Sequence, residues 1–185
     1  MAEATQLRTD RLQLRPWRDS DRAPFAAMCA DPAVMEFLLP VPDRTASDAL
    51  LDRLQAGISA RGWGFWALEL RSTQAFIGFT GIQVPGSALP FSPCVEIGWR
   101  LATAHWGQGY ATEAARTALA FGFEALELPE IVAFTTLHNQ RSQAVMQRLG
   151  MQAEPESFDH PAVPPRHPLR EHRLYRLARQ HWVNR

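Results

Sequence analysis

The chain has 185 residues, with a hydrophobic share of 46% and a charged share of 21%, which is typical of one globular domain with a sizeable core. Its 19 basic residues are all Arg and balance 19 acidic residues, so no net charge draws it to nucleic acid or to an anionic membrane. The lack of Lys excludes Schiff-base chemistry and a Walker phosphate-binding loop.

The cysteines, the histidines and the N-terminal residues exclude further classes of protein. Cys29 and Cys94 form neither a disulfide framework nor a zinc pattern, and His160, His167 and His172 lack zinc spacing. The N-terminal residues are charged and lack a signal-peptide apolar segment, and no apolar run is long enough to span a membrane. We therefore expect a cytoplasmic protein with no metal and with neither a membrane nor a nucleic acid as partner.

The first sixty residues predict one strand and two helices. Residues 7–15 alternate between apolar and polar side chains, as in a half-buried strand. A helix over 23–29 follows an acidic cluster that can cap it. A Pro-rich loop over 31–46 leads to a second helix, which Ser47 is expected to cap and whose leucines fall on one face.

From residue 63 the pattern becomes that of a sheet with two further helices. Aromatic and β-branched runs predict strands over 63–70, 75–84 and 95–101, of which the first two form a hairpin. A helix, a strand, a helix and two strands are then expected over 110–126, 131–136, 139–150, 151–158 and 169–177. This mixed α/β order predicts a single domain over residues 1–185.

The glycine-containing turn after the strand 95–101 is the most informative segment. Gly107 and Gly109 let an anion approach the backbone closely, and the following helix directs its N–H groups and its dipole at the same point. A pyrophosphate would suit such a turn, and a plain glycine start to a helix is the alternative. The segment lacks the third glycine of the dinucleotide-binding fingerprint.

Three segments in chain order resemble the GCN5-related N-acetyltransferase (GNAT) family, in particular the branch of bacterial ribosomal-protein N-terminal acetyltransferases. They are Leu7–Arg15, Trp106–Ala111 and Thr136–Met151. The second fits the family's cofactor motif, Arg/Gln-x-x-Gly-x-Gly/Ala, at Gly109 and Ala111, whereas Trp106 stands where Arg or Gln is usual. The third is similar to the branch's Asn-x-x-Ser helix that ends in Leu-Gly-Met.

The resemblance implies an α/β fold with a twisted, mixed central sheet of about seven strands and helices on both faces. The fourth strand, 95–101, would splay from the fifth, 131–136, and the pantetheine arm of acetyl-CoA would lie in the gap. The resemblance also implies acetyl-CoA as cosubstrate, no metal, and a primary amine as acceptor, either a protein N-terminus or a small molecule. A homodimer is compatible with the family.

The residues that the resemblance assigns to cofactor binding come from the strand, the turn and the second helix cap. They are Ile97, Trp99, Leu101, Trp106, Gly107, Gln108, Gly109, Tyr110, Ala111, Thr112 and Asn139. Asn139 is also suited to cap its helix, and capping alone would account for it.

Direct attack of an amine on a thioester needs a base, a stabilised oxyanion and an acid for the leaving thiolate. Glu96 is the candidate base because it lies in an apolar strand at the splay, and a structural pair with an Arg is the alternative. Ser142 resembles the branch's acid near the sulfur, with an exposed helix serine as the alternative. Tyr110 is a second candidate acid, and His105 or His138 could relay a proton. No Cys falls at a motif position, which argues against an acyl-enzyme.

Two other functions stay open. One is a non-catalytic module that binds or senses acyl-CoA, for which Glu96 and Ser142 would be dispensable. The other is an acyltransferase with a longer acyl donor, which would need a large pocket around Phe65, Phe76 and Trp99. The histidines of the Pro-rich stretch could flank an acceptor pocket.

Overall fold

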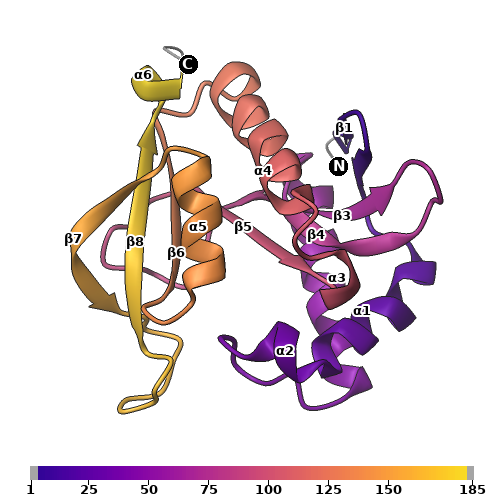
Figure 1. Cartoon of the computed structure of the whole chain (residues 1–185), viewed down its shortest axis with the longest axis horizontal. Helices are drawn as coiled ribbons and strands as arrows, with labels where there is room; N and C mark the ends of the chain where they lie inside the picture. Colours follow the sequence, from indigo (N-terminus) through magenta and orange to yellow (C-terminus); the bar gives the residue numbers. More distant parts are fainter. Residues whose placement is uncertain (1–3, 183–185) are drawn as a thin grey trace.

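The computed structural model describes residues 4–182, which contain one eight-stranded sheet (Figure 1). Its strands are β1 (Leu7–Arg8), β2 (Leu12–Arg15), β3 (Phe65–Leu70), β4 (Phe76–Gln83), β5 (Glu96–Leu101), β6 (Glu130–Thr136), β7 (Gln152–Asp159) and β8 (Glu171–Ala178). The spatial order is β1-β2-β3-β4-β5-β6-β8-β7. The β5–β6 pair is parallel and the other neighbours are antiparallel. The predicted mixed sheet is confirmed.

Helices cover both faces of the sheet. They are α1 (Arg22–Ala30), α2 (Pro32–Met35), α3 (Arg44–Arg61), α4 (Tyr110–Ala120, continued by a π-helical turn over Phe121–Ala125), α5 (Gln140–Arg148) and α6 (Arg179–Trp182). On one face the α1 residue Phe25 packs edge-on against Phe79 of β4. On the other face, Gly122 lies against Ile82 and Ile131. Within residues 4–182, no helix is both long and apolar enough to cross a membrane.

The N-terminal strand and the second helix start differ from the prediction. Residues 7–15 form a hairpin instead of one strand, because the Thr9 side chain and backbone both bond to Leu12 and close a turn. This hairpin raises the strand count to eight from the expected seven. The Ser47 cap is wrong: Asp43 accepts the N–H of Ala46 (2.8 Å) and caps α3, while Ser47 is buried one turn inside the helix.

The strands β5 and β6 separate, as the family resemblance implied. Their register pairs only Glu96 with Val132, where the Val132 N–H donates to the carbonyl of Val95 (3.0 Å). Beyond this point β5 leads into the glycine turn before α4, and β6 leads into the turn before α5. One edge of β5 is therefore open, and both helix starts face the gap (Figure 1).

Candidate active site

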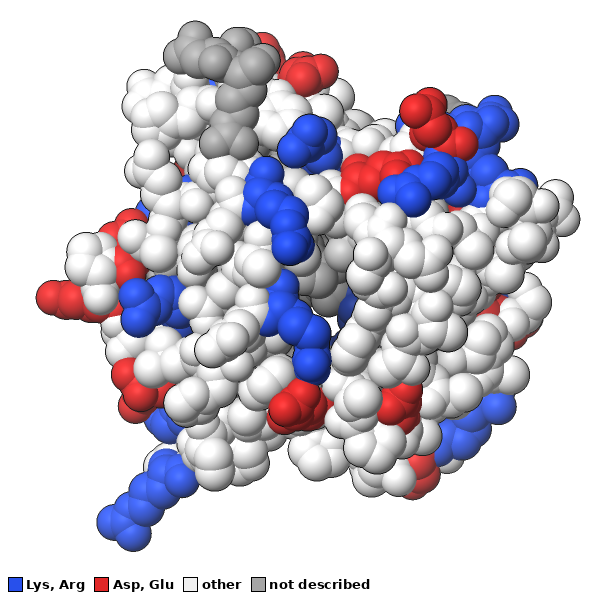
Figure 2. Space-filling model, in the orientation of Figure 1, with Lys and Arg blue, Asp and Glu red and all other residues white. Residues whose placement is uncertain are grey.

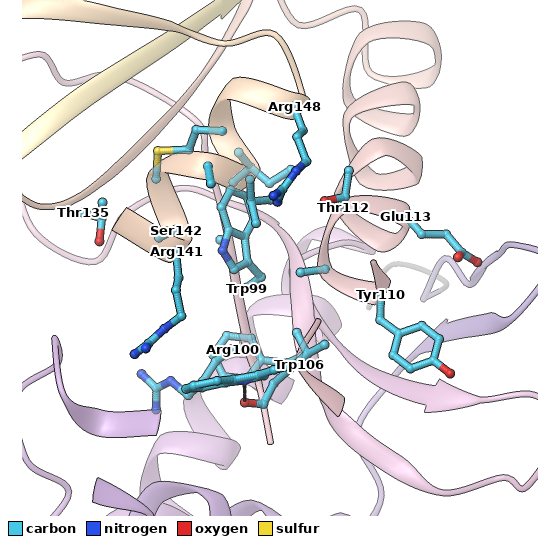
Figure 3. A pocket seen from close by; sticks show the side chains of 18 of the residues that line it. Trp99, Arg100, Trp106, Tyr110, Thr112, Glu113, Thr135, Arg141, Ser142 and Arg148 are labelled. Carbon is cyan, nitrogen blue, oxygen red and sulfur yellow. Dashed lines mark hydrogen bonds between the residues drawn. The ribbon is translucent and has the colours of Figure 1, made fainter. Parts of the chain in front are cut away.

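A cleft of about 1380 Å³ lies where β5 and β6 separate. Its walls come from β5, the turn before α4, the first turns of α4 and α5, and the segment around α2 (Figure 3). All but one of the residues predicted for the site line it: Glu96, Ile97, Trp99, Leu101, Trp106, Gly107, Gly109, Tyr110, Ala111, Thr112, Asn139 and Ser142. The exception is Gln108, whose side chain donates to the carbonyl of Ala104 (3.2 Å).

The glycine turn adopts a conformation that favours glycine twice. Gly107 and Gly109 have φ values of +73° and +80°, in the left-handed region. Among the described residues, nothing lies within 4 Å of a Cβ placed at Gly107, and only Arg11 comes within that distance at Gly109. The N-terminus of α4 is thus bordered by open backbone, the arrangement expected of an anion-binding turn.

The β1–β2 hairpin holds this turn from outside, a contact that the sequence reading missed. Arg11 donates from Nη1 to the carbonyl of Gln108 (3.0 Å) and from Nε to Glu113 of α4 (2.7 Å), and its guanidinium stacks on the Tyr110 ring. Glu113 also accepts from the Thr9 hydroxyl (2.5 Å). Burial opposes ionisation of Glu113, but the bonds from Thr9 and Arg11 lower its pKa. The partners lie about a hundred positions apart, so no local pattern reveals them.

Side chains alternate along β5 between two faces of the sheet. Ile97 and Leu101 are buried on the α4 face. The opposite face carries Glu96, Gly98 and Arg100, which stand across from Gln83, Gly81 and Phe79 of β4. This second row lies on the side of α1 and α2. Residues from both faces of β5 therefore line the cleft.

Glu96 has a single hydrogen-bond partner among the described residues. The Gln83 amide donates to its carboxylate (2.7 Å), and no arginine of residues 4–182 pairs with it, so the alternative of a structural ion pair is wrong. Burial raises the pKa of Glu96 to about 7, against the opposing effect of the Gln83 bond. A carboxyl group with this pKa can exchange a proton near neutral pH.

The start of α5 brings Asn139 and Ser142 to the cleft. Asn139 caps the helix, as expected, by accepting the N–H of Ser142 (3.2 Å), and its amide donates to Thr135 (2.9 Å). Ser142 is partly buried and lines the cleft, so it is not an exposed helix serine. Figure 3 shows the Tyr110 hydroxyl directed away from Ser142, which fits the packing of this ring against Arg11.

Histidines contribute little to the described cleft. His105 lines it, whereas His138 is not among its lining residues. The rings of His160 and His172 lie 5.0 Å apart and pack on Phe134, which does line the cleft. Burial lowers the pKa of both. Within residues 4–182, no group of three or more His, Cys, Asp or Glu side chains could hold a metal ion.

Four arginines that the sequence reading did not select also line the cleft: Arg100, Arg116, Arg141 and Arg148. Basic side chains follow the central hollow of the molecule in Figure 2. Arg116 stands one helical turn after Thr112, a spacing that could have indicated it. Trp106 donates to the Leu101 carbonyl (2.8 Å), and the Arg141 guanidinium lies 4.6 Å from its ring centre. These two contacts hold the Trp106 ring in place in the cleft wall, although Trp106 departs from the family motif.

Comparison with known proteins supports the same interpretation. A family model described as an acetyltransferase (GNAT) domain matches residues 11–152. The uncharacterized protein YkkB of Bacillus subtilis is 34% identical over 152 residues, 82% of this chain and 87% of that protein. The FsC-acetyl coenzyme A-N(2)-transacetylase of Aspergillus fumigatus is 29% identical over 96% of this chain and 77% of its own length. The crystal structure of an Agrobacterium tumefaciens acetyltransferase is 30% identical, with a TM-score of 0.74 and 96% of each chain covered.

Proposed function

Because the chain belongs to the GNAT family of acetyltransferases and is an N-acetyltransferase, we propose that it acetylates a primary amine by direct attack in a ternary complex. The donor is acetyl-CoA, which supplies an activated acetyl group as a thioester. Glu96 is the proposed base and Ser142 the proposed acid.

The residues of the cleft fit such a donor. The open backbone of the turn at Gly107 and Gly109 suits a pyrophosphate. Arg116 and Arg148 line the cleft without an ion pair to any described carboxylate, and they would meet the remaining phosphate charge. The open edge of β5 offers backbone groups to the pantetheine arm, with Asn139 on the opposite wall.

The proposed chemistry balances with two side chains. As the amine nitrogen bonds to the acetyl carbon and the carbon–sulfur bond breaks, Glu96 takes the proton that the amine loses. Ser142 donates a proton to the departing thiolate, and the proton taken by Glu96 returns through water to Ser142, which resets both groups. Backbone N–H groups of β5 on its open edge would stabilise the negative charge on the thioester oxygen.

The observation that carries this proposal is the state of Glu96. A partly buried carboxyl with one amide partner, with no ion pair in the described chain and with a pKa of about 7, is suited to act as a base. A non-catalytic binding module would have no need for this costly arrangement.

The test begins with calorimetry of acetyl-CoA binding, with NADH as the comparator, and continues with CoA release from a panel of amines. We expect Glu96→Gln to lower kcat about 100-fold or more and to abolish the rise of the rate around pH 7. The matched control is Glu130→Gln, at the start of β6 and outside the cleft lining, which should leave kcat unchanged.

Three results would contradict the proposal. The first is a lack of acetyl-CoA binding at millimolar concentration. The second is binding without CoA release from any amine, which would favour the sensing module. The third is a faster reaction with a longer acyl-CoA, which would favour the other alternative.

A further inference from the structure

Arg100 is a cleft arginine that lacks a carboxylate partner among the described residues. Its Nη1 donates only to the sulfur of Cys29 (3.7 Å), and its Nε is buried with no hydrogen-bond partner in residues 4–182. The guanidinium lies 5.3 Å from the ring centre of Phe79. Burial lowers the pKa of Arg100. A buried charge without a counter-charge is costly unless a ligand supplies one.

Arg141 extends from α5 toward the same end of the cleft. Both residues line the cleft, and in the view of Figure 3 their guanidinium groups lie at the same end of it. Arg141 pairs with Glu36 (2.7 Å), but both side chains are more than half exposed, so this pair is weak and can rearrange. Two guanidinium groups at one end of a cleft can bind an anion there.

The floor between Glu96 and Arg100 is apolar. Gly98 stands between them in the row, and a Cβ built on it would lie 2.9 Å from the Phe65 ring. Phe65 and Phe79 also line the cleft. Four residue steps along the strand separate the Cα atoms of Glu96 and Arg100 by about 13 Å, at about 3.3 Å per step. A carbon chain would fit over this floor, with an amine at the Glu96 end and an anion at the Arg100 end.

We propose that Arg100 and Arg141 bind a carboxylate on the acceptor, so that the preferred substrate is an amine with a carboxylate several carbons away. This inference rests on the proposed function, because it needs Glu96 to receive the proton of the same acceptor. A carboxylate suits the planar guanidinium fork, which binds it through two parallel hydrogen bonds.

The test compares matched acceptors that differ only in charge: γ-aminobutyrate with γ-aminobutyramide, and ε-aminocaproate with ε-aminocaproamide. Their amines are far enough from the carboxyl group to have similar pKa values. The quantity measured is the ratio of kcat/KM for acid and amide, by CoA release at saturating acetyl-CoA. We expect the wild-type ratio to be about 10 or more, from the strength of a charge-assisted hydrogen bond.

Substitutions assign the preference to residues. Arg100→Gln should bring the ratio close to one, and Arg141→Gln should lower it by a smaller factor, because Arg141 is more exposed. The matched control is Arg53→Gln, on the exposed side of α3 and outside the cleft lining, which should change neither ratio nor rate.

Equal rates for acid and amide in the wild type, or an unchanged ratio in Arg100→Gln, would overturn the inference while leaving acetyl transfer intact. A raised KM for acetyl-CoA with an unchanged ratio would assign Arg100 to the donor and overturn it as well. If no amine in the panel reacts, calorimetry decides, with the N-acetylated products added to the CoA-loaded protein. Tighter binding of the acid product, lost in Arg100→Gln, supports the inference, and equal binding overturns it. Failure to bind acetyl-CoA would instead defeat the proposed function.

Discussion

Two arginines on the sheet, one buried and one partly buried, have opposite surroundings. Arg15 of β2 is 3% exposed, and its guanidinium donates twice to Asp21 (2.8 Å each) and once to Glu69 (2.7 Å). Among residues 4–182, Arg100 of β5 contacts only the Cys29 sulfur and the face of the Phe79 ring. Burial acts against the charge of both, yet the carboxylates raise the pKa of Arg15, while that of Arg100 falls.

The carboxylates of the two regions repeat the contrast. Glu69 pairs with Arg15 and Arg18, whereas Glu96 has one amide partner and a raised pKa. At β2 and β3, the chain itself supplies the counter-charges of Arg15 and Glu69. In the cleft, Glu96 and Arg100 have no partner of opposite charge among residues 4–182, as expected where ligands complete the arrangement. The pairing of charged side chains thus separates a part of the sheet that stabilises the fold from the part that we propose acts on substrate.

The largest expected effect compares Arg15→Gln with Arg100→Gln. Loss of Arg15 leaves the buried Asp21 without an ion pair and Glu69 with only the exposed Arg18, and it should lower the free energy of unfolding by about 3–5 kcal/mol. Loss of Arg100 removes an unpaired charge and should change it by less than about 1 kcal/mol, or raise it. Urea unfolding at neutral pH measures both.

Arg18→Gln serves as the control for Arg15, since Arg18 also contacts Glu69 but is 58% exposed. Its pair should contribute less than about 1 kcal/mol. If Arg15→Gln and Arg100→Gln lower the free energy of unfolding by the same amount, the distinction between the two regions is wrong.

The pH dependence of stability gives the next effect. The pKa of Glu96 in the folded protein is about 7, above its ordinary value of 4.5, so the folded state holds this proton more tightly than the unfolded state does. The contribution of protonated Glu96 to the free energy of unfolding is fully present below pH 4.5 and is lost as the pH rises through 7. Between pH 5 and pH 8, wild type should lose stability relative to Glu96→Gln, on the order of 2 kcal/mol.

Urea unfolding of both proteins at several pH values measures this difference. A constant gap between wild type and Glu96→Gln over the whole range would show that Glu96 is not desolvated in the folded protein. The base role proposed for it would then lose its physical basis.

The sequence predicted what local pattern and family resemblance can carry. The glycine turn, the Asn139 cap and the separation of the strands over 95–101 and 131–136 all follow from segments that are continuous in the chain. The hairpin at Thr9 was missed because its turn is only three residues long.

Long-range placement was beyond the sequence. Nothing local shows that β8 lies between β6 and β7. Nor does it show that Arg100 meets Cys29, 71 positions away, instead of a carboxylate. The difference between a paired and an unpaired arginine lies in the packing of distant elements, so composition and spacing treat Arg15 and Arg100 alike.

The smallest expected effect concerns Arg11, an exposed arginine that contacts the glycine turn before α4. Its pair with Glu113 is 47% and 22% exposed, so Arg11→Gln should change the free energy of unfolding by less than about 1 kcal/mol. It should raise the Kd of acetyl-CoA about 3-fold, because the bond to the Gln108 carbonyl and the stacking on Tyr110 hold the turn in its binding conformation. Calorimetry measures the Kd.

Arg71→Gln is the matched control, because Arg71 donates to the carbonyls of Thr9 and Asp10 in the same hairpin without contacting the turn. If the two variants weaken binding equally, the hairpin as a whole acts on the donor site and Arg11 has no special part. If only Arg11→Gln weakens binding, Arg11 itself contributes to acetyl-CoA binding although it is exposed. It then belongs, like the unpaired Arg100, with the arginines that we expect to act on ligands. The burial of an arginine would then predict how much its loss changes the free energy of unfolding. Its contact with the cleft or with the glycine turn would predict the effect on ligand binding.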